Sequence, residues 1–244
     1  MLLRLLSAAL AAGFLAAVVA TGLELALTSP LIVAAEAYEA RDTHQAGGGL
    51  PIVHVHAGHD HTAPDGKASP EWQPGEGLPR VAFTGLATLV GAVGYALLLG
   101  AVMLACGREP TPEAGLAFAV AGFASVALAP ALGLPPELPG SEAAPLVARQ
   151  AWWVMTAAAT GMGLYLIGVR RSLIAILGGL VLIVAPHLAG APQPPPGASE
   201  LPAALAAQFA ARSLAVGFVF WVLIGLGLGW AWQGFGRGRG VARA

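Results

Sequence analysis

The sequence predicts an all-α integral membrane protein with six transmembrane helices arranged as three helical hairpins. Apolar residues make up 57% of the chain and charged residues only 10%, whereas soluble domains carry about 25% charged residues. Six stretches approach or exceed the roughly 20 apolar residues that a helix needs to cross a bilayer. They cover residues 5–32, 80–106, 114–134, 147–168, 171–190 and 204–230. We expect a single membrane domain over residues 1–244, with a histidine-rich outer loop over residues 40–79.

The six stretches are expected to be helices because lipid offers the backbone no hydrogen-bond partner, and a helix satisfies its own N–H and C=O groups. The stretches are continuously apolar, whereas the strands of a membrane barrel alternate between apolar and polar residues. The sequence therefore disfavours a barrel.

The first stretch allows two interpretations. Arg4 followed by an alanine-rich apolar run is also typical of a secretory signal peptide. However, the run is longer than the 7–15 apolar residues of such a signal, and it continues beyond Glu24 to Pro30. We expect a membrane span here; cleavage would leave five spans.

The six stretches are expected to pair through three outer segments, which are acidic or rich in proline. These are residues 36–79, 134–142 and 192–200. Each segment follows a proline near the end of one span and precedes an arginine near the start of the next. The prolines are Pro30, Pro130 and Pro186, and the arginines are Arg80, Arg149 and Arg212. This pattern suggests a threefold hairpin repeat; the alternative is that prolines simply favour helix ends and loops.

The distribution of basic residues predicts the orientation. Seven arginines lie in the two termini and the short connections on the same side, whereas five basic residues are spread over the longer outer segments. Because short cytoplasmic connections carry the excess of Lys and Arg, we expect both termini in the cytoplasm.

The outer loop holds the strongest chemical signal, four imidazoles and one carboxylate within eight residues. These are His54, His56, His59, His61 and Asp60. Neutral imidazole binds cobalt, nickel, copper and zinc, and short histidine-rich tracts typically bind metal. A soft Cu(I) site is disfavoured, because the chain has one cysteine and four methionines. We expect reversible capture of a divalent transition metal; the alternative is a solvated loop that is merely rich in histidine.

Ionisable residues at membrane depth are costly and suggest a functional site. Glu24 lies in the first span, Glu36 and Glu39 follow it, Glu137 lies in the second outer segment, and His187 follows Pro186. We expect these five to line a cation path. The alternatives are an ion pair with an arginine for Glu24, interfacial charges for Glu36 and Glu39, and a structural role for His187.

Another group is expected to be structural. Trp152 and Trp153 open the fourth span, where tryptophan anchors a helix at the membrane interface. Arg149 is expected to hold an acidic residue of the preceding loop, and Gln150 lies beside it. Pro130 and Pro186 shape the ends of two spans.

Several function classes are disfavoured by missing motifs. The only lysine, Lys67, precedes Ala68, whereas a P-loop requires Gly-Lys followed by Ser or Thr. We therefore expect no ATP bound by this chain. No HExxH, Ser-His-Asp or dinucleotide motif is visible, so an enzyme is not expected. No basic patch with interleaved aromatic residues indicates nucleic-acid binding.

In these features the chain resembles the CbtA family of predicted cobalt transporter subunits. The matching segments are Pro30–Ile32, Ala35–Glu39, the histidine-rich loop, Trp72–Arg80, Gly122–Phe123, Ala129–Gly140, Arg149–Trp153, Pro186–Pro192 and Phe209. The resemblance implies a bacterial inner-membrane protein that imports cobalt for cobalamin synthesis. It also implies a small partner, CbtB, with one span and its own histidine motif.

We therefore expect the membrane subunit of a cobalt uptake transporter, with cobalt(II) as the transported ion, nickel and zinc as alternatives, and no tightly bound cofactor. We expect the lipid bilayer to surround the helices of this chain. Two other hypotheses stay open: a membrane-anchored metal sensor or chaperone that does not transport, and a metal-dependent membrane enzyme.

Overall fold

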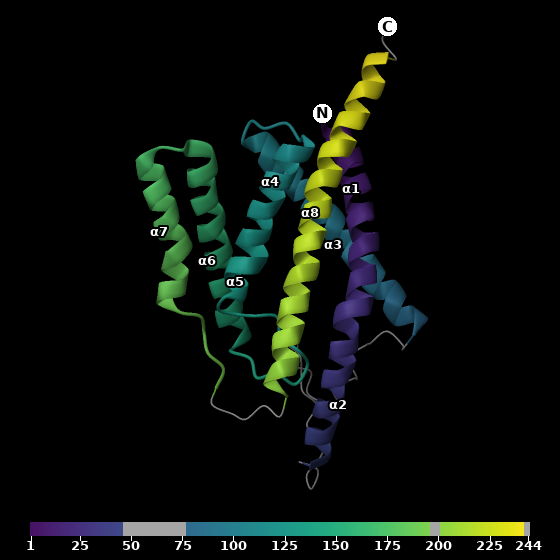
Figure 1. The fold of residues 1–244 in the computed structure, drawn as a ribbon, viewed down its shortest axis with the longest axis vertical. Coiled ribbons are helices and arrows are strands. Elements are labelled where there is room, and N and C mark those ends of the chain that lie inside the picture. The colour runs from purple at the N-terminus through teal and green to yellow at the C-terminus, as the bar shows by residue number, and fades with distance from the viewer. Residues whose placement is uncertain (46–76, 196–200, 242–244) are drawn as a thin grey trace, which may run out of the picture.

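A computed structural model describes the backbone of residues 1–45, 77–195 and 201–241, and the side chains of residues 1–38, 77–195 and 201–236. Throughout this part of the chain the regular elements are helices (Figure 1). They are α1 (Leu2–Leu23), α2 (Ser29–Gln45), α3 (Leu78–Ala105), α4 (Pro112–Phe123), α5 (Ala129–Ala131), α6 (Leu146–Tyr165), α7 (Leu173–Ala189) and α8 (Ala203–Val241), with the π-helical turns η1 (Glu24–Thr28), η2 (Ala124–Leu128) and η3 (Leu166–Arg170).

The prediction of a helical membrane protein is confirmed. Five helices of the described part are long and apolar enough to span a bilayer, and the shorter apolar helix α7 is the sixth. The first helix runs on through η1 and α2 to Gln45, beyond the expected end at residue 32. Residues 33–45 are helix formers that need no apolar environment, so hydropathy marks the membrane boundary there rather than the end of the helix.

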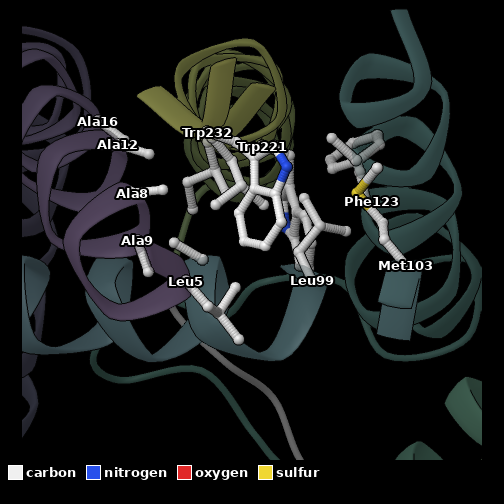
Figure 2. Packing of buried hydrophobic residues seen from close by; sticks show 14 residues of the cluster. Leu5, Ala8, Ala9, Ala12, Ala16, Leu99, Met103, Phe123, Trp221 and Trp232 are labelled. Carbon is white, nitrogen blue, oxygen red and sulfur yellow. The ribbon is translucent and has the colours of Figure 1, made fainter. Parts of the chain in front are cut away.

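The main core lies where α1, α3, α4 and α8 meet (Figure 2). Helix α1 contributes a row of alanines, which lets α3 and α8 approach its backbone closely. The large side chains come from the facing helices. The buried cluster comprises Leu5, Ala8, Ala9, Ala12, Ala16, Ala96, Leu99, Met103, Ala119, Phe123, Trp221, Ile224, Leu228 and Trp232. The start of α1 and the end of α8 lie at the same end of the bundle, here called the termini end (Figure 1). The opposite end, where α2 ends, is the loop end.

Helices α6 and α7 form a separate pair held by a glycine contact. A Cβ atom built on Gly163 would lie 2.6 Å from the carbonyl oxygen of Gly179, and the reverse distance is also 2.6 Å. Ile167 and Ile183 pack beside the two glycines with the same symmetry. Within the described part, α7 packs on α6 and η3 rather than on α8, so the third predicted hairpin is open.

The two π-helical turns η1 and η2 share a cause. Each precedes a proline by one residue, Pro30 and Pro130, and the residue before that proline donates its N–H to a carbonyl five residues back. Proline has no N–H, and its ring collides with the carbonyl four residues earlier. A π-turn accommodates this with one extra residue. The first and second hairpins thus share a π-turn at the same place before a proline.

The fold predicts which glycines tolerate a side chain. Gly225 of α8 crosses Gly115 of α4 so closely that an added Cβ would lie 2.5 Å from the Cβ of Ala119, whereas Gly234 of the same helix has open space around it. Gly225→Ala should therefore lower the free energy of unfolding by about 1–3 kcal/mol. Gly234→Ala should leave it unchanged or raise it by up to about 1 kcal/mol.

Thermal unfolding of the purified protein in detergent compares the two variants. Equal midpoints for both would show that the α4–α8 crossing is not as close as described.

Candidate cation pathway

A cavity of about 870 Å³ lies between the first helix, α3 and α8 and extends from Tyr95 to Gly77. Glu24, Thr28 and Glu36 line it from η1 and α2, and Arg80 and Thr88 line it from α3. Helix α8 contributes Phe209, Ser213, Val216, Gly217 and Phe220. We call this space the Glu24 cavity.

Glu24 is partly buried in the wall of this cavity. Its Oε2 accepts a hydrogen bond of 3.2 Å from Thr88 Oγ1. The Thr28 hydroxyl donates instead to the Glu24 backbone carbonyl, at 2.9 Å. Among the described side chains no arginine forms an ion pair with Glu24, so the ion-pair alternative for this residue finds no partner there.

Glu36 lies in the same cavity, nearer the loop end. Arg80 donates to it at 2.8 Å, and both side chains remain partly exposed. An exposed pair of this kind contributes about 0–1 kcal/mol to stability. Gly77, the first described residue after the histidine-rich segment, also lines the cavity. The chain therefore emerges from that segment at the cavity.

The π-turn η1 explains why Glu24 and Glu36 share one cavity. Twelve residues of regular α-helix would place them roughly 120° apart around the axis. The extra residue of a π-turn takes up about 100° of that rotation, so the two residues fall within roughly 20° of each other. The same correction leaves a rise of roughly 17 Å between them, so the two carboxylates are too far apart to share one ion.

Aromatic residues close the cavity on its way to the termini end. Tyr95 lines it from α3. The Tyr95 ring packs edge-on against Phe220, with centroids 6.1 Å apart, and tilted against Trp221 at 5.1 Å. Trp221 also belongs to the buried core. These packed rings therefore bound the cavity on the termini side of Glu24.

The predicted metal-binding residues His54, His56, His59, His61 and Asp60 lie outside the described residues. Glu39 lies on α2, one turn beyond Glu36, but its side chain is not described. Among the side chains that are described, no three His, Cys, Asp or Glu groups come together to hold a metal. Within the described residues, the Glu24 cavity thus offers a cation two separate carboxylates, Glu24 and Glu36, together with threonine and serine hydroxyls.

Glu137 and His187 lie elsewhere. Glu137 accepts a 2.5 Å hydrogen bond from Arg149, the partner type expected for that arginine, and lines a smaller cavity of about 370 Å³ with Glu142 and Gln193. His187 packs edge-on against the Trp152 ring, with centroids 6.1 Å apart. Neither residue lines the Glu24 cavity, so the structure does not join all the predicted path residues in one space.

The other predicted structural residues surround this second region. Trp152 and Pro186 are buried. Gln150 and Trp153 line a shallow hollow beside Arg149. Pro130 is buried next to η2.

A polar stripe on α3 escaped the sequence analysis. Arg80, Thr84, Thr88, Gly91 and Tyr95 recur at intervals of three and four residues, and all line the Glu24 cavity. Such spacing places residues on one helix face. The pattern is readable in the sequence, but threonine and glycine are also common at packed helix interfaces in membranes.

The second hairpin repeats this arrangement with one change. Pro130 follows η2 as Pro30 follows η1, and Arg149 pairs with Glu137 as Arg80 pairs with Glu36. However, the first residue of η2 is Ala124, whereas η1 begins with Glu24. A carboxylate at the π-turn is thus particular to the first hairpin.

Comparison with known proteins identifies the family. A search of curated proteins and a search of solved structures found no match. One family model, described as "Probable cobalt transporter subunit (CbtA)", matches residues 2–233. Since the match spans nearly the whole chain, and its helices suit a multi-pass membrane protein, the protein belongs to the CbtA family of probable cobalt transporter subunits.

Proposed function

We propose that this chain carries a divalent transition-metal ion, cobalt(II) by family, through the membrane by way of the Glu24 cavity. One observation supports this above all: Glu24 and Glu36, roughly 17 Å apart along one helix, line the same cavity, and that cavity reaches Gly77, the first described residue after the histidine-rich segment. Intramembrane carboxylates that face a cavity typically mark ion pathways.

The proposed order of events begins in the outer loop. His54, His56, His59 and His61 collect the ion, Glu36 and Glu39 receive it, and Glu24 binds it at membrane depth with Thr88 beside it. Imidazole and carboxylate accept cobalt, nickel and zinc alike, so the choice of cobalt rests on the family. Glu137 and His187 remain candidates for a second, separate contact.

The driving force is the membrane potential. We place the protein in a bacterial inner membrane, as the family resemblance implies, with its termini in the cytoplasm, as the arginine distribution predicts. A divalent cation moving inward then gains roughly 4–5 kcal/mol per 100 mV. No ATP is required of this chain. A small single-span subunit resembling CbtB is the proposed partner, and lipid surrounds both.

Tyr95, Phe220 and Trp221 pack together on the termini side of Glu24. Passage of an ion therefore requires these rings to move. We propose that the described conformation is the one that accepts the ion from outside. Opening of the aromatic closure would release the ion towards the termini end.

Glu24→Gln should lower cobalt uptake by about 10–100-fold, because it removes a charged ligand group worth about 1.5–3 kcal/mol. Glu109→Gln is the matched control, since Glu109 is exposed and does not line the Glu24 cavity. The measurement is cobalt accumulation in proteoliposomes under an imposed potential.

The same assay separates transport from the sensor or chaperone alternative. If the protein only binds metal as a sensor or chaperone, Glu24→Gln and His187→Ala should leave its function unchanged. Loss of the loop histidines should abolish that function. Equal uptake by Glu24→Gln and the wild-type protein would contradict the proposed path.

Arg80→Gln should lower the cobalt concentration needed for half-maximal uptake by about fivefold. It removes a positive charge from the entrance and frees Glu36 for the ion, a change of about 1 kcal/mol at 4 Å in water. The thermal midpoint should barely change, because the pair is exposed. An increase in the half-maximal concentration would show that Arg80 does not compete with the ion.

Replacing His54, His56, His59 and His61 together by alanine should raise the half-maximal cobalt concentration while leaving the uptake rate at saturation close to that of the wild type, because the loop concentrates the ion but does not form the membrane path. Initial rates over a range of cobalt concentrations test this. Loss of uptake at saturating cobalt would place an essential site in the loop.

A further inference from the structure

A second large cavity lies near the termini end, on the side of the bundle away from the Glu24 cavity. It has a volume of about 530 Å³ and is bounded by α3, α4 and the α6–η3 helix. Its walls are mainly apolar and include Leu98, Val102, Phe118, Val126 and Leu164. Leu98 and Val102 are exposed on the bundle, so the cavity opens sideways towards the membrane.

Helix packing explains why this space is not filled. Helix α6 contacts the preceding span mainly at η2 and α5, and it has little contact with α4. Helix α3 packs chiefly on α1 and α8. The helices α4 and α6 therefore diverge towards the termini end (Figure 1), and no side chain of the described residues occupies the gap between them.

Two arginines stand at the mouth of the cavity. Arg108 lies in the turn between α3 and α4, and Arg171 lies in the turn between η3 and α7; both line the cavity and both are exposed. Among the described side chains neither forms an ion pair. In contrast, Arg4 at the same end is engaged, because its Nε donates to the Trp232 carbonyl at 2.8 Å and its guanidinium stacks 4.2 Å from the Trp232 ring centroid.

The backbone holds Arg171 in an unusual conformation. Its φ of 55° is the only positive value at a non-glycine residue of the described part, and this left-handed conformation costs roughly 1–2 kcal/mol for a residue with a Cβ. Its Nε donates to the Gly168 carbonyl at 2.8 Å, and among the described side chains no ion pair engages its two terminal nitrogens. A glycine would fit this turn without strain. Arginine at this position therefore points to a role for its side chain.

We propose that this cavity binds an anionic phospholipid, with the phosphate held by Arg108 and Arg171 and one acyl chain lying between α3, α4 and α6. Guanidinium groups bind phosphate oxygens through paired hydrogen bonds. Basic pockets between transmembrane helices are suited to anionic headgroups, and the apolar wall beneath suits a hydrocarbon chain. The acidic neighbours Glu109 and Glu113 do not line the cavity.

The native cysteine provides a probe, because Cys106, the single cysteine of the chain, lines this cavity. The full-length protein is placed in nanodiscs of phosphatidylcholine, with or without phosphatidylglycerol. Alkylation of Cys106 by a maleimide is followed, and native mass spectrometry measures the ratio of the two phospholipids retained. We expect phosphatidylglycerol to slow the alkylation and to be retained preferentially.

Arg108→Gln and Arg171→Gly should each lower that preference about fivefold, and the double variant about 25-fold. Glycine at position 171 keeps the turn, so this variant remains folded while losing the guanidinium. Arg170→Gln is the matched control, since Arg170 is the neighbouring exposed arginine but does not line the cavity. It should retain the full preference.

Three results would overturn the proposal. The first is an unchanged lipid preference in the double variant. The second is protection of Cys106 by inorganic phosphate in pure phosphatidylcholine, which would indicate a site for a free anion. The third is protection that appears only when a helical partner polypeptide copurifies, which would assign the cavity to a protein. Cobalt uptake is not part of the test, so its outcome is independent of the proposed transport function.

Discussion

The arrangement of the site depends on how a membrane helix accommodates a proline. In lipid an unpaired carbonyl has no water to bind, so the backbone before Pro30 re-pairs as the π-turn Glu24–Thr28. That turn adds one residue to the helix and rotates everything beyond it. Glu36 is thereby brought onto the face of Glu24, and α3 can present Thr88 and Arg80 to both. Without the π-turn the two carboxylates would face different neighbours.

The two ends of the bundle are packed differently, and this difference confines the cavity. At the termini end, the alanines of α1 and the crossing of Gly115 with Gly225 bring α1, α3, α4 and α8 into close contact. Towards the loop end, η1 and α2 are separated from α3 and α8 by the Glu24 cavity, whose lining ends at Tyr95 and Phe220. The second hairpin has the same proline, π-turn and arginine–glutamate pair, but Ala124 stands where Glu24 would be. The scaffold is therefore repeated while the intramembrane carboxylate is not.

The length of the apolar stretches predicted the helical membrane class and the spans. The cost of charge in lipid marked Glu24 and Glu36 as candidate functional residues. Their common cavity could not be predicted, because a one-residue π-turn changes the phase of a helix without changing its composition. The absence of packing between α7 and α8 in the described part was also beyond the sequence, since α6 and α8 are both chain neighbours of α7 and the Gly163–Gly179 contact has no directional signature. Glu137 and His187 do not line the Glu24 cavity, because Glu137 is paired with Arg149 and His187 packs on Trp152. The histidine-rich segment stays a prediction, since it lies outside the described residues.

The central claim is that a divalent cation binds at Glu24 inside the membrane region. Anomalous X-ray scattering at the cobalt absorption edge, from crystals of the full chain grown with cobalt(II), tests it most directly. We expect an anomalous peak in the Glu24 cavity, within direct coordination distance of a Glu24 carboxylate oxygen, and loss of that peak in Glu24→Gln. Peaks confined to the histidine-rich segment, with none in the cavity at saturating cobalt, would contradict it.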